Sequence, residues 1–137
     1  MTAMSKSPFN RILHVDDQAD IRGIVKLALG KIGGFSVCSC SSGEEALAAA
    51  PAFDPELLLI DMSMPGMDGM DLLVRMRESG IRAPAVFFTA RINPSDLERY
   101  RAAGAMGTLS KPFDPLKLGR QLIQIWVENQ GAAEGAT

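Results

Sequence analysis

The chain has 137 residues and a mass of 14.7 kDa, which fits one domain and excludes a second sizeable one. Hydrophobic residues make up 47% and charged residues 22%, so the composition supports a packed core and not a disordered chain. The net charge of −2 gives no basic field for phosphate backbones, and no apolar run suits a membrane span or secretory signal. We therefore expect a cytoplasmic protein that neither binds nucleic acid directly nor inserts into a membrane.

Five short apolar segments have the pattern of strands in a parallel sheet. Most are unbroken apolar runs, which are typical of strands that helices cover on both faces. The second segment has polar serine neighbours, which indicates an edge strand. In chain order, the predicted strands are 11–15, 35–40, 57–60, 85–88 and 107–110.

A stretch of helical periodicity follows each predicted strand. Ser42 and Glu45 form a capping box for the second helix, which we expect Pro51 to end. Asn93 and Asp114 each precede a proline, the pattern of a helix start, in the fourth and fifth helices. In chain order, the predicted helices are 21–32, 43–50, 70–78, 94–103 and 115–129.

The alternation of strands and helices predicts the architecture of the domain. It favours an α/β fold, a doubly wound five-stranded parallel sheet with five helices on its two faces. We expect this domain to cover residues 9–129, with a disordered N-terminus at 1–8 and a flexible tail at 130–137. In such folds the ligand site lies at the carboxyl ends of the strands.

Five chemically active side chains stand at or just after the predicted strand ends: Asp16, Asp17, Asp61, Thr89 and Lys111. A single aspartate after a strand is most often a turn or a helix cap. Five such residues at one edge of a sheet indicate a site. Carboxylates about 4 to 6 Å apart repel by roughly 3 to 4 kcal/mol per pair at an effective dielectric of about 20, so three of them need a cation.

The residue types at this edge predict phosphoryl chemistry. An all-oxygen acidic pocket selects Mg²⁺, with Mn²⁺ as the alternative ion, and leaves positions open for a phosphoryl oxygen. The Lys111 ammonium suits a phosphate as a point charge, and the Thr89 hydroxyl can donate a hydrogen bond. These parts describe a carboxylate nucleophile that receives a phosphoryl group while cations neutralise its oxygens.

The motifs at these strand ends are family-specific in order and spacing. They are ILHVDD at 12–17, LLLIDMSMPGMDG at 57–69, FFTA at 87–90, GA at 104–105 and KPF at 111–113. With them the chain resembles the receiver domain of bacterial two-component response regulators, of the stand-alone, chemotaxis-regulator-like kind. The resemblance covers nearly all of residues 9–129. It implies a flavodoxin-like three-layer sandwich with strand order 2-1-3-4-5.

The resemblance also implies roles for individual residues. Asp61 would accept a phosphoryl group from a histidine kinase or histidine phosphotransfer protein. Asp17 would bind Mg²⁺ directly and Asp16 mostly through water, with Asp61 and the backbone carbonyl of Ser63 as further ligands. The protein would be a signalling module, and not an enzyme beyond its own phosphorylation and dephosphorylation.

A conformational switch is part of the same resemblance. Thr89 would turn toward the phosphoryl group, Lys111 would pair with it, and the bond before Pro112 would be cis. The family usually has an aromatic residue where this chain has Thr108, so we expect less help from a rotating ring. A downstream target would bind the face made by the fourth helix, fifth strand and last helix, and a homodimer is an alternative use of the apolar last helix.

Two positions flank the proposed path of the water that hydrolyses an acyl phosphate. Ser63 and Arg91 stand two residues beyond Asp61 and Thr89, so we expect them to tune the phosphoryl lifetime. Two other functions stay open. An aspartyl-nucleophile phosphatase would place its nucleophile on the first strand, and a phosphorylation-independent scaffold would not need the complete acidic site.

Three further polar residues favour structural roles. His14 lies inside the first predicted strand, one step below the acidic residues, and we expect it to be buried and hydrogen-bonded. Cys38 and Cys40 stand two apart on a strand, so they share a face without the geometry of a disulfide bond. We expect reduced thiols.

Overall fold

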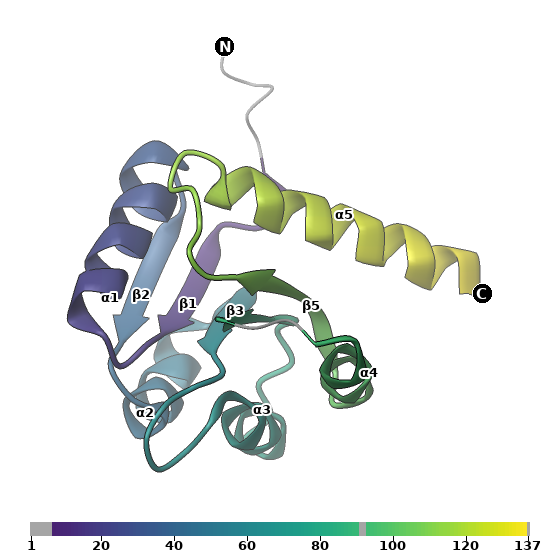
Figure 1. The fold of residues 1–137 in the computed structure, drawn as a ribbon, viewed down its shortest axis with the longest axis horizontal. Coiled ribbons are helices and arrows are strands. Elements are labelled where there is room, and N and C mark those ends of the chain that lie inside the picture. Colours follow the sequence, from purple (N-terminus) through teal and green to yellow (C-terminus); the bar gives the residue numbers. More distant parts are fainter. Residues whose placement is uncertain (1–6, 91–92, 137) are drawn as a thin grey trace.

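A parallel five-stranded sheet with helices on both faces forms the body of the protein (Figure 1). The computed structural model describes residues 7–90 and 93–136, and the side chains of the last helix up to residue 129. The sheet order is β2-β1-β3-β4-β5, which confirms the expected doubly wound topology. The strands are β1 (Arg11–Val15), β2 (Ser36–Cys40), β3 (Leu57–Asp61), β4 (Ala85–Thr89) and β5 (Ala105–Ser110).

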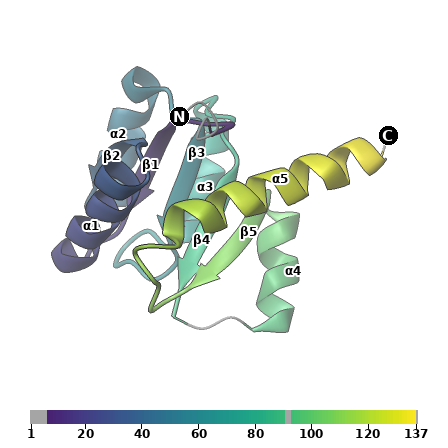
Figure 2. The ribbon, with the colours of Figure 1, turned by 90° about the horizontal axis from the view of Figure 1, so that it is seen from above.

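The helices form two layers around the sheet. Figure 1 shows α1 and α5 on one face and α2, α3 and α4 on the other, and Figure 2 shows the same layers from above. Their bounds are α1 (Ala19–Lys26), the π-helix η2 (Leu27–Ile32) that continues α1, α2 (Gly43–Phe53), α3 (Gly69–Glu78), α4 (Pro94–Ala102) and α5 (Leu118–Ala136).

The central strand β3 divides the core between these layers. All five of its residues are buried, as the unbroken apolar run predicts. Leu58 and Ile60 pack in the cluster with α2 and α3, whereas Leu57 and Leu59 pack in the cluster with α1, η2 and α5. Because neighbouring residues face opposite sides, β3 is fixed in register from both faces.

Two helices differ from their expected bounds in the first half of the chain. The predicted helix 21–32 is α-helical to Lys26 and then π-helical, and the Gly33 N–H donates to the Ala28 carbonyl five residues back. Helix α2 does not end before Pro51 but runs to Phe53. A proline close to the last turn removes only one internal hydrogen bond, so the helix tolerates it there.

The last helix differs at both ends. It begins at Leu118 and not at Pro115, because Asp114 accepts the N–H of Leu116 in a turn that precedes the helix. It continues past residue 129 to Ala136, through a segment whose alanines favour a helix and whose two glycines oppose it. Figures 1 and 2 show this end projecting past β5. The assignment of 130–137 as a flexible tail stays a prediction.

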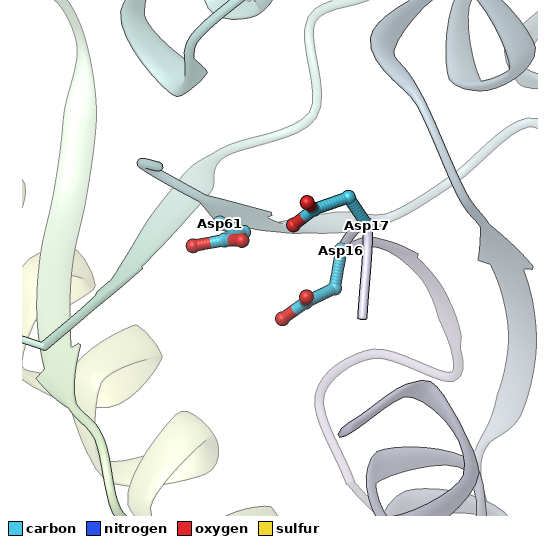
Figure 3. Close-up of side chains that lie close together, drawn as sticks. All are labelled: Asp16, Asp17 and Asp61. Carbon is cyan, nitrogen blue, oxygen red and sulfur yellow. The ribbon is translucent and has the colours of Figure 1, made fainter. Parts of the chain in front are cut away.

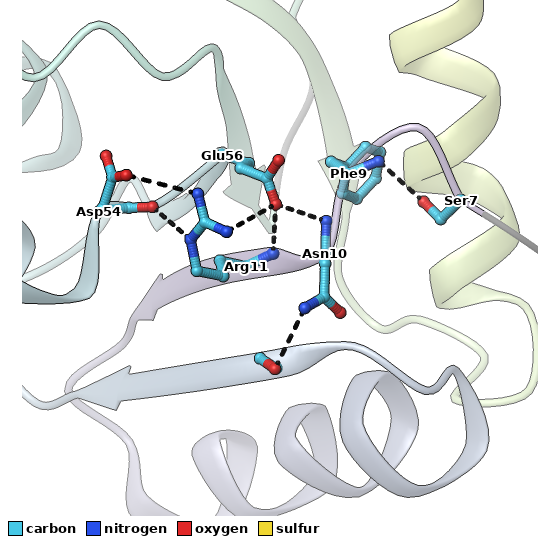
Figure 4. A network of polar contacts seen from close by, with 7 residues as sticks. Ser7, Phe9, Asn10, Arg11, Asp54 and Glu56 are labelled. Carbon is cyan, nitrogen blue, oxygen red and sulfur yellow. Dashed lines mark hydrogen bonds and ion pairs between the residues drawn. The ribbon is translucent and has the colours of Figure 1, made fainter.

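A polar network closes the end of the sheet opposite to the strand ends that carry the aspartates (Figure 4). Oε1 of Glu56 accepts the backbone N–H groups of Asn10 and Arg11 at 2.8 and 3.0 Å. The Arg11 side chain donates to the Asp54 carbonyl at 2.7 Å. These contacts satisfy backbone donors that would otherwise lack partners where β1 enters the sheet.

No helix within the described ranges combines the length and apolar character needed to cross a membrane.

Candidate functional site

Two adjacent strands bring three carboxylates together at one edge of the sheet. β1 ends at Val15, immediately before Asp16 and Asp17, and Asp61 is the last residue of β3. Ligand oxygens of the three side chains all lie within 4.8 Å of one another (Figure 3). Asp16 and Asp61 are buried and Asp17 is exposed. The predicted convergence of these residues is therefore correct.

Lys111 is the cation that this cluster contains. It follows β5, and its Nζ donates to Asp16 Oδ2 at 3.0 Å and lies 3.2 Å from Asp61 Oδ1. The ammonium also lies 5.5 Å from the centre of the Phe88 ring. Burial alone would lower the pKa of Lys111, but the hydrogen bond to Asp16 and the charge of Asp61 raise it above its ordinary value. Lys111 is therefore charged at neutral pH.

Backbone groups hold the two buried carboxylates in place. The N–H of Gln18 donates to Asp16 Oδ1 at 3.0 Å, and the N–H of Ser63 donates to Asp61 Oδ1 at 3.2 Å. The guanidinium of Arg22 donates to the carbonyl of Asp16 at 2.8 Å. Each aspartate is thus oriented by the turn that follows its own strand.

The Asp61 carboxyl lies in an environment that penalises its charge. Burial raises the pKa of Asp61 above its ordinary value, and the Asp16 charge raises it further, against the Ser63 hydrogen bond and the Lys111 charge. A second cation would favour the ionised form. A cavity of about 320 Å³ next to Asp61 can receive one, and its lining residues are Asp17, Gln18, Asp61, Ser63, Ala90 and Lys111.

The carboxylates fit a small, hard divalent cation. Oxygen ligands on opposite sides of Mg²⁺ are about 4.2 Å apart, since each bond is about 2.1 Å. Oxygens within 4.8 Å of one another can therefore converge on one ion after small side-chain rotations. This acidic pocket can bind a metal.

Among the remaining predicted site residues, Thr89 and Pro112 adjoin residues of the pocket and Thr108 lies elsewhere. Thr89 is buried at the end of β4, and its carbonyl accepts the N–H of Lys111 at 2.8 Å. The bond between Lys111 and Pro112 is cis, as the resemblance implied. Thr108 is half-buried in β5, away from the carboxylates. Arg91 lies outside the described residues.

Thr108 lines a separate cavity between β5 and α5. Its volume is about 530 Å³, and it is lined by Arg101, Ala105, Met106, Gly107, Thr108, Ile125, Glu128 and Asn129. The helix approaches the strand closely here, since a Cβ on Gly107 would come within 2.8 Å of Ile125 Cγ2.

Sequence reasoning missed several residues that shape the pocket. Gln18 and Ala90 line it, and Arg22 binds the Asp16 carbonyl. Gln18 directly follows ILHVDD and Ala90 is the last residue of FFTA, so their positions offered a signal. The position of Arg22 offered no such signal, because an arginine on an amphipathic helix is usually part of its solvent-exposed face.

His14 is buried, as expected. The hydrogen bond that we expected for its ring is not found among the described residues. Both ring nitrogens lack a partner among them, because Asp16 Oδ2 is 3.9 Å from Nε2, too far for a direct bond. Burial lowers the pKa of His14 to about 4, although the Asp16 charge opposes this shift. The ring is thus neutral at pH 7.

The two cysteines are free, as predicted. Their sulfur atoms are 4.0 Å apart on the same side of β2, and Cys40 is buried. This distance is about twice that of a disulfide bond.

Comparison with protein families identifies the class of protein that this fold and site define. Residues 12–123 match the family model described as the response regulator receiver domain. The chain therefore belongs to this family, whose members are the phosphoacceptor signalling modules of two-component systems, not classical enzymes.

Individual relatives agree with this assignment. The transcriptional regulatory protein TrcR of Mycobacterium tuberculosis is 36% identical over 75% of this chain, which spans 40% of that protein. The nitrate/nitrite response regulator protein NarL of Escherichia coli is 32% identical over 88% of the chain, which spans 56% of NarL. The chain thus spans about half the length of these relatives or less.

Among solved structures, the chemotaxis protein CheY4 of Vibrio cholerae is similar over nearly its whole length. The TM-score is 0.77 at 32% identity, and the match covers 85% of this chain and 98% of CheY4.

Proposed function

We propose that Asp61 of this receiver domain accepts a phosphoryl group from a histidine kinase or a histidine phosphotransfer protein. The observation that carries the proposal is the placement of Lys111, whose ammonium lies 3.2 Å from Asp61 Oδ1 at the mouth of an acidic pocket. A cation held beside a carboxylate at an open cavity can neutralise a phosphoryl group that becomes attached to that carboxylate.

Mg²⁺ is the proposed cofactor, with Mn²⁺ as a substitute. Asp17, Asp61 and the Ser63 carbonyl would hold it directly, and Asp16 mostly through water. When bound, the ion supplies positive charge to phosphoryl oxygens and favours the ionised form of Asp61. The exposed Asp17 gives the ion access from solvent.

The transfer step is a displacement at phosphorus. A carboxylate oxygen of Asp61 forms a bond to the phosphorus atom of a phosphohistidine, and the P–N bond breaks. Its electron pair stays on the imidazole nitrogen of the donor, which takes up a proton. Lys111 pairs with an oxygen of the transferred group, and Thr89 donates its hydroxyl hydrogen to another. Later attack by water at phosphorus releases phosphate and restores Asp61, so the chain catalyses only its own modification.

The output surface is the second part of the proposal. The face formed by α4, β5 and α5 would bind a downstream protein, or a second copy of the chain, once Asp61 is phosphorylated. Val127 of α5 is 56% exposed, and α4, β5 and α5 all contribute residues to the cavity beside Thr108. Exposed apolar surface and a cavity on these elements suit a protein partner.

Acetyl phosphate tests the phosphoryl acceptor without any kinase. Intact-mass spectrometry should show one added phosphoryl group in the wild type with Mg²⁺, and none in Asp61→Asn. Asp71→Asn is the matched control, because Asp71 is an exposed aspartate on α3 outside the pocket, and it should be labelled like the wild type.

Three outcomes would overturn the proposal. Equal labelling of the wild type and Asp61→Asn would place the phosphoryl group elsewhere. Repeated turnover of a phosphoester by the wild type would favour an aspartyl phosphatase, and absence of labelling in the wild type would favour a phosphorylation-independent scaffold.

A further inference from the structure

The turn between β1 and α1 brings two neighbouring carboxylates to one place. Successive residues of a strand point to opposite faces of a sheet, so adjacent aspartates on an extended chain would diverge. Asp16 and Asp17 instead place their oxygens within 4.8 Å of each other and of Asp61 (Figure 3). The chain leaves β1 at Val15 and bends at Asp17 before α1 begins at Ala19. The backbone of Asp17 therefore decides whether its carboxylate faces the pocket.

Hydrogen bonds hold the peptide groups on both sides of Asp17. The peptide group before it carries the Asp16 carbonyl, which accepts a hydrogen bond from Arg22 Nη1 at 2.8 Å. The peptide group after it carries the Gln18 N–H, which donates to Asp16 Oδ1 at 3.0 Å. A planar peptide leaves only φ and ψ free at each residue, and these two bonds fix the planes between which Asp17 turns. They therefore set the direction in which the Asp17 side chain points.

The two hydrogen bonds differ in what else their acceptor groups do. The Asp16 carboxylate accepts the Gln18 N–H on one oxygen and the Lys111 ammonium, at 3.0 Å, on the other. Its surroundings therefore change whenever a metal ion or a phosphoryl group enters the pocket. The bond from Arg22 to the Asp16 carbonyl uses neither carboxylate oxygen, so it can persist in every state of the pocket.

Arg22 is also part of this turn through its backbone. Its N–H donates to the Gln18 carbonyl at 3.0 Å, while its side chain reaches back to Asp16. One residue thus holds the turn from both ends. A guanidinium stays charged in proteins, and charged donors make the stronger hydrogen bonds. Arg22 is half-buried, which limits the competition of water for this bond.

We infer that Arg22 is a positioning residue for the adjacent carboxylates of Asp16 and Asp17. Its side chain fixes the peptide group before Asp17 and so directs both carboxylates toward Mg²⁺. The role rests on the proposed function, because Mg²⁺ is the proposed cofactor. The described lining of the pocket does not include Arg22, so this residue acts through the two aspartates.

The charge of the guanidinium alone would have the opposite effect on metal binding. A cation near an acidic pocket repels a second cation, so its removal should strengthen Mg²⁺ binding. Loss of the hydrogen bond to Asp16 should weaken Mg²⁺ binding, because Asp17 is no longer held toward the pocket. The sign of the change in affinity therefore separates the two effects.

Calorimetric titration with Mg²⁺ measures this sign. Arg22→Met removes the charge and the donor but keeps an unbranched side chain, and it should weaken binding about 10-fold, the lower end for loss of a group that orients a metal ligand. Arg22→Lys keeps the charge and one donor group, and it should recover part of the loss. Lys26→Met is the matched control, because Lys26 is exposed on the same helix, outside the described pocket lining, and loses the same charge. Lys26→Met should not weaken Mg²⁺ binding.

Amide hydrogen exchange in the metal-free protein tests the turn itself. The Gln18 amide should lose protection in Arg22→Met but not in Lys26→Met, since Asp16, which accepts this amide, is then less firmly held. The Met62 amide donates to the Phe88 carbonyl at 3.0 Å and should keep its protection in both variants. Loss of protection at both amides of Arg22→Met would assign the effect to the whole fold and overturn the positioning role.

The outcomes separate this inference from the proposed function. Mg²⁺ binding by Arg22→Met that equals or exceeds that of Lys26→Met would overturn the positioning role and leave the proposed cofactor intact. Unchanged protection of the Gln18 amide in Arg22→Met would do the same. A wild type that binds no Mg²⁺ would overturn both the proposed cofactor and the positioning role.

Discussion

Lys111 contacts two buried carboxylates at the site, so its charge has two partners. Asp16 and Asp61 both lie within 3.2 Å of its ammonium. Coordination of a metal by the carboxylates would release Lys111 for a phosphoryl oxygen. The unphosphorylated site is therefore held together by a cation that the proposed reaction also uses. Removal of one partner of a buried ion pair typically costs about 3 to 5 kcal/mol.

Metal binding should be visible as stabilisation of the unphosphorylated protein. Mg²⁺ at millimolar concentration should raise the Tm of the wild type, because a ligand that binds only the native state stabilises it. Asp17→Asn should remove most of this increase. Asp20→Asn is the control, since it loses the same charge nearby on an exposed side chain outside the pocket. A wild-type Tm that does not respond to Mg²⁺ would contradict the metal site.

Ser63 and Arg91 should control how long the phosphoryl group persists. Ser63 lines the cavity and is exposed, and Arg91 stands two residues after Thr89. Arg91→Ala and Ser63→Ala should each change the dephosphorylation rate without blocking phosphorylation, because they alter the access of water. The decay of the phosphorylated mass peak with time measures this rate. Unchanged half-lives in both variants would refute the idea.

The hydrogen bonds of Glu56, which lies far from the site, should make the free energy of unfolding depend on pH. Its hydrogen bonds from the backbone N–H groups of Arg11 and Asn10 lower the pKa of Glu56. A lowered carboxyl pKa stabilises the fold above the ordinary pKa of 4.5, and the effect is lost as the pH falls through the folded-state value. Glu56→Gln should lower the free energy of unfolding at pH 7 by at most about 1 kcal/mol, since the side chain is partly exposed.

Urea unfolding at pH 7 and at pH 3 measures the Glu56 effect. The wild type and Glu56→Gln should differ at pH 7 and converge at low pH. A difference that is the same at both values would mean that the charge of Glu56 contributes nothing.

At the scale of elements, β5 and α5 connect the pocket to the proposed output surface. Thr108 lies in the last half of β5, three residues before Lys111, which directly follows the strand. Helix α5 packs closely on β5 where Ile125 approaches Gly107. Threonine is small and stiff at χ1, so movement of Thr108 itself changes little volume. The response to phosphorylation should therefore involve displacement of whole elements rather than rotation of one ring.

Beryllofluoride, which imitates a phosphoryl group, should reveal this displacement. It should change amide hydrogen exchange in α4 and in α5 as far as Val127, because Thr89 and Lys111 make contacts in the occupied state that they lack in the empty one. Mass spectrometry of peptic peptides locates the change. A response confined to the loops around Asp16 and Asp61 would contradict the proposed route, and Asp61→Asn should show none.

The whole molecule shows what a single sequence can and cannot predict. The strands and the convergence of Asp16, Asp17, Asp61 and Lys111 follow from apolar runs that end on charged residues, because parallel strands share one carboxyl edge. The sequence patterns that mark helix ends predicted their positions less well than the apolar runs predicted the strands. The passage of α2 through Pro51 and the length of α5 depend on tertiary packing and on helix propensity outside the core.

The contacts among the buried polar side chains could not be predicted from sequence patterns. The sequence places His14 within a strand, but only the register with β2 brings it next to Ser39. The distances among Asp16, His14 and Lys111 likewise depend on strand pairing and not on spacing along the chain.

The central claim, that Asp61 is the phosphoryl acceptor, has a direct chemical test. Borohydride reduction of the acetyl-phosphate-treated protein converts an aspartyl phosphate into homoserine, and peptide sequencing by mass spectrometry then locates the modified position. We predict homoserine at position 61, only in samples treated with both Mg²⁺ and acetyl phosphate. Homoserine at another aspartate, or at none in protein that carries an added phosphoryl group, would contradict the account.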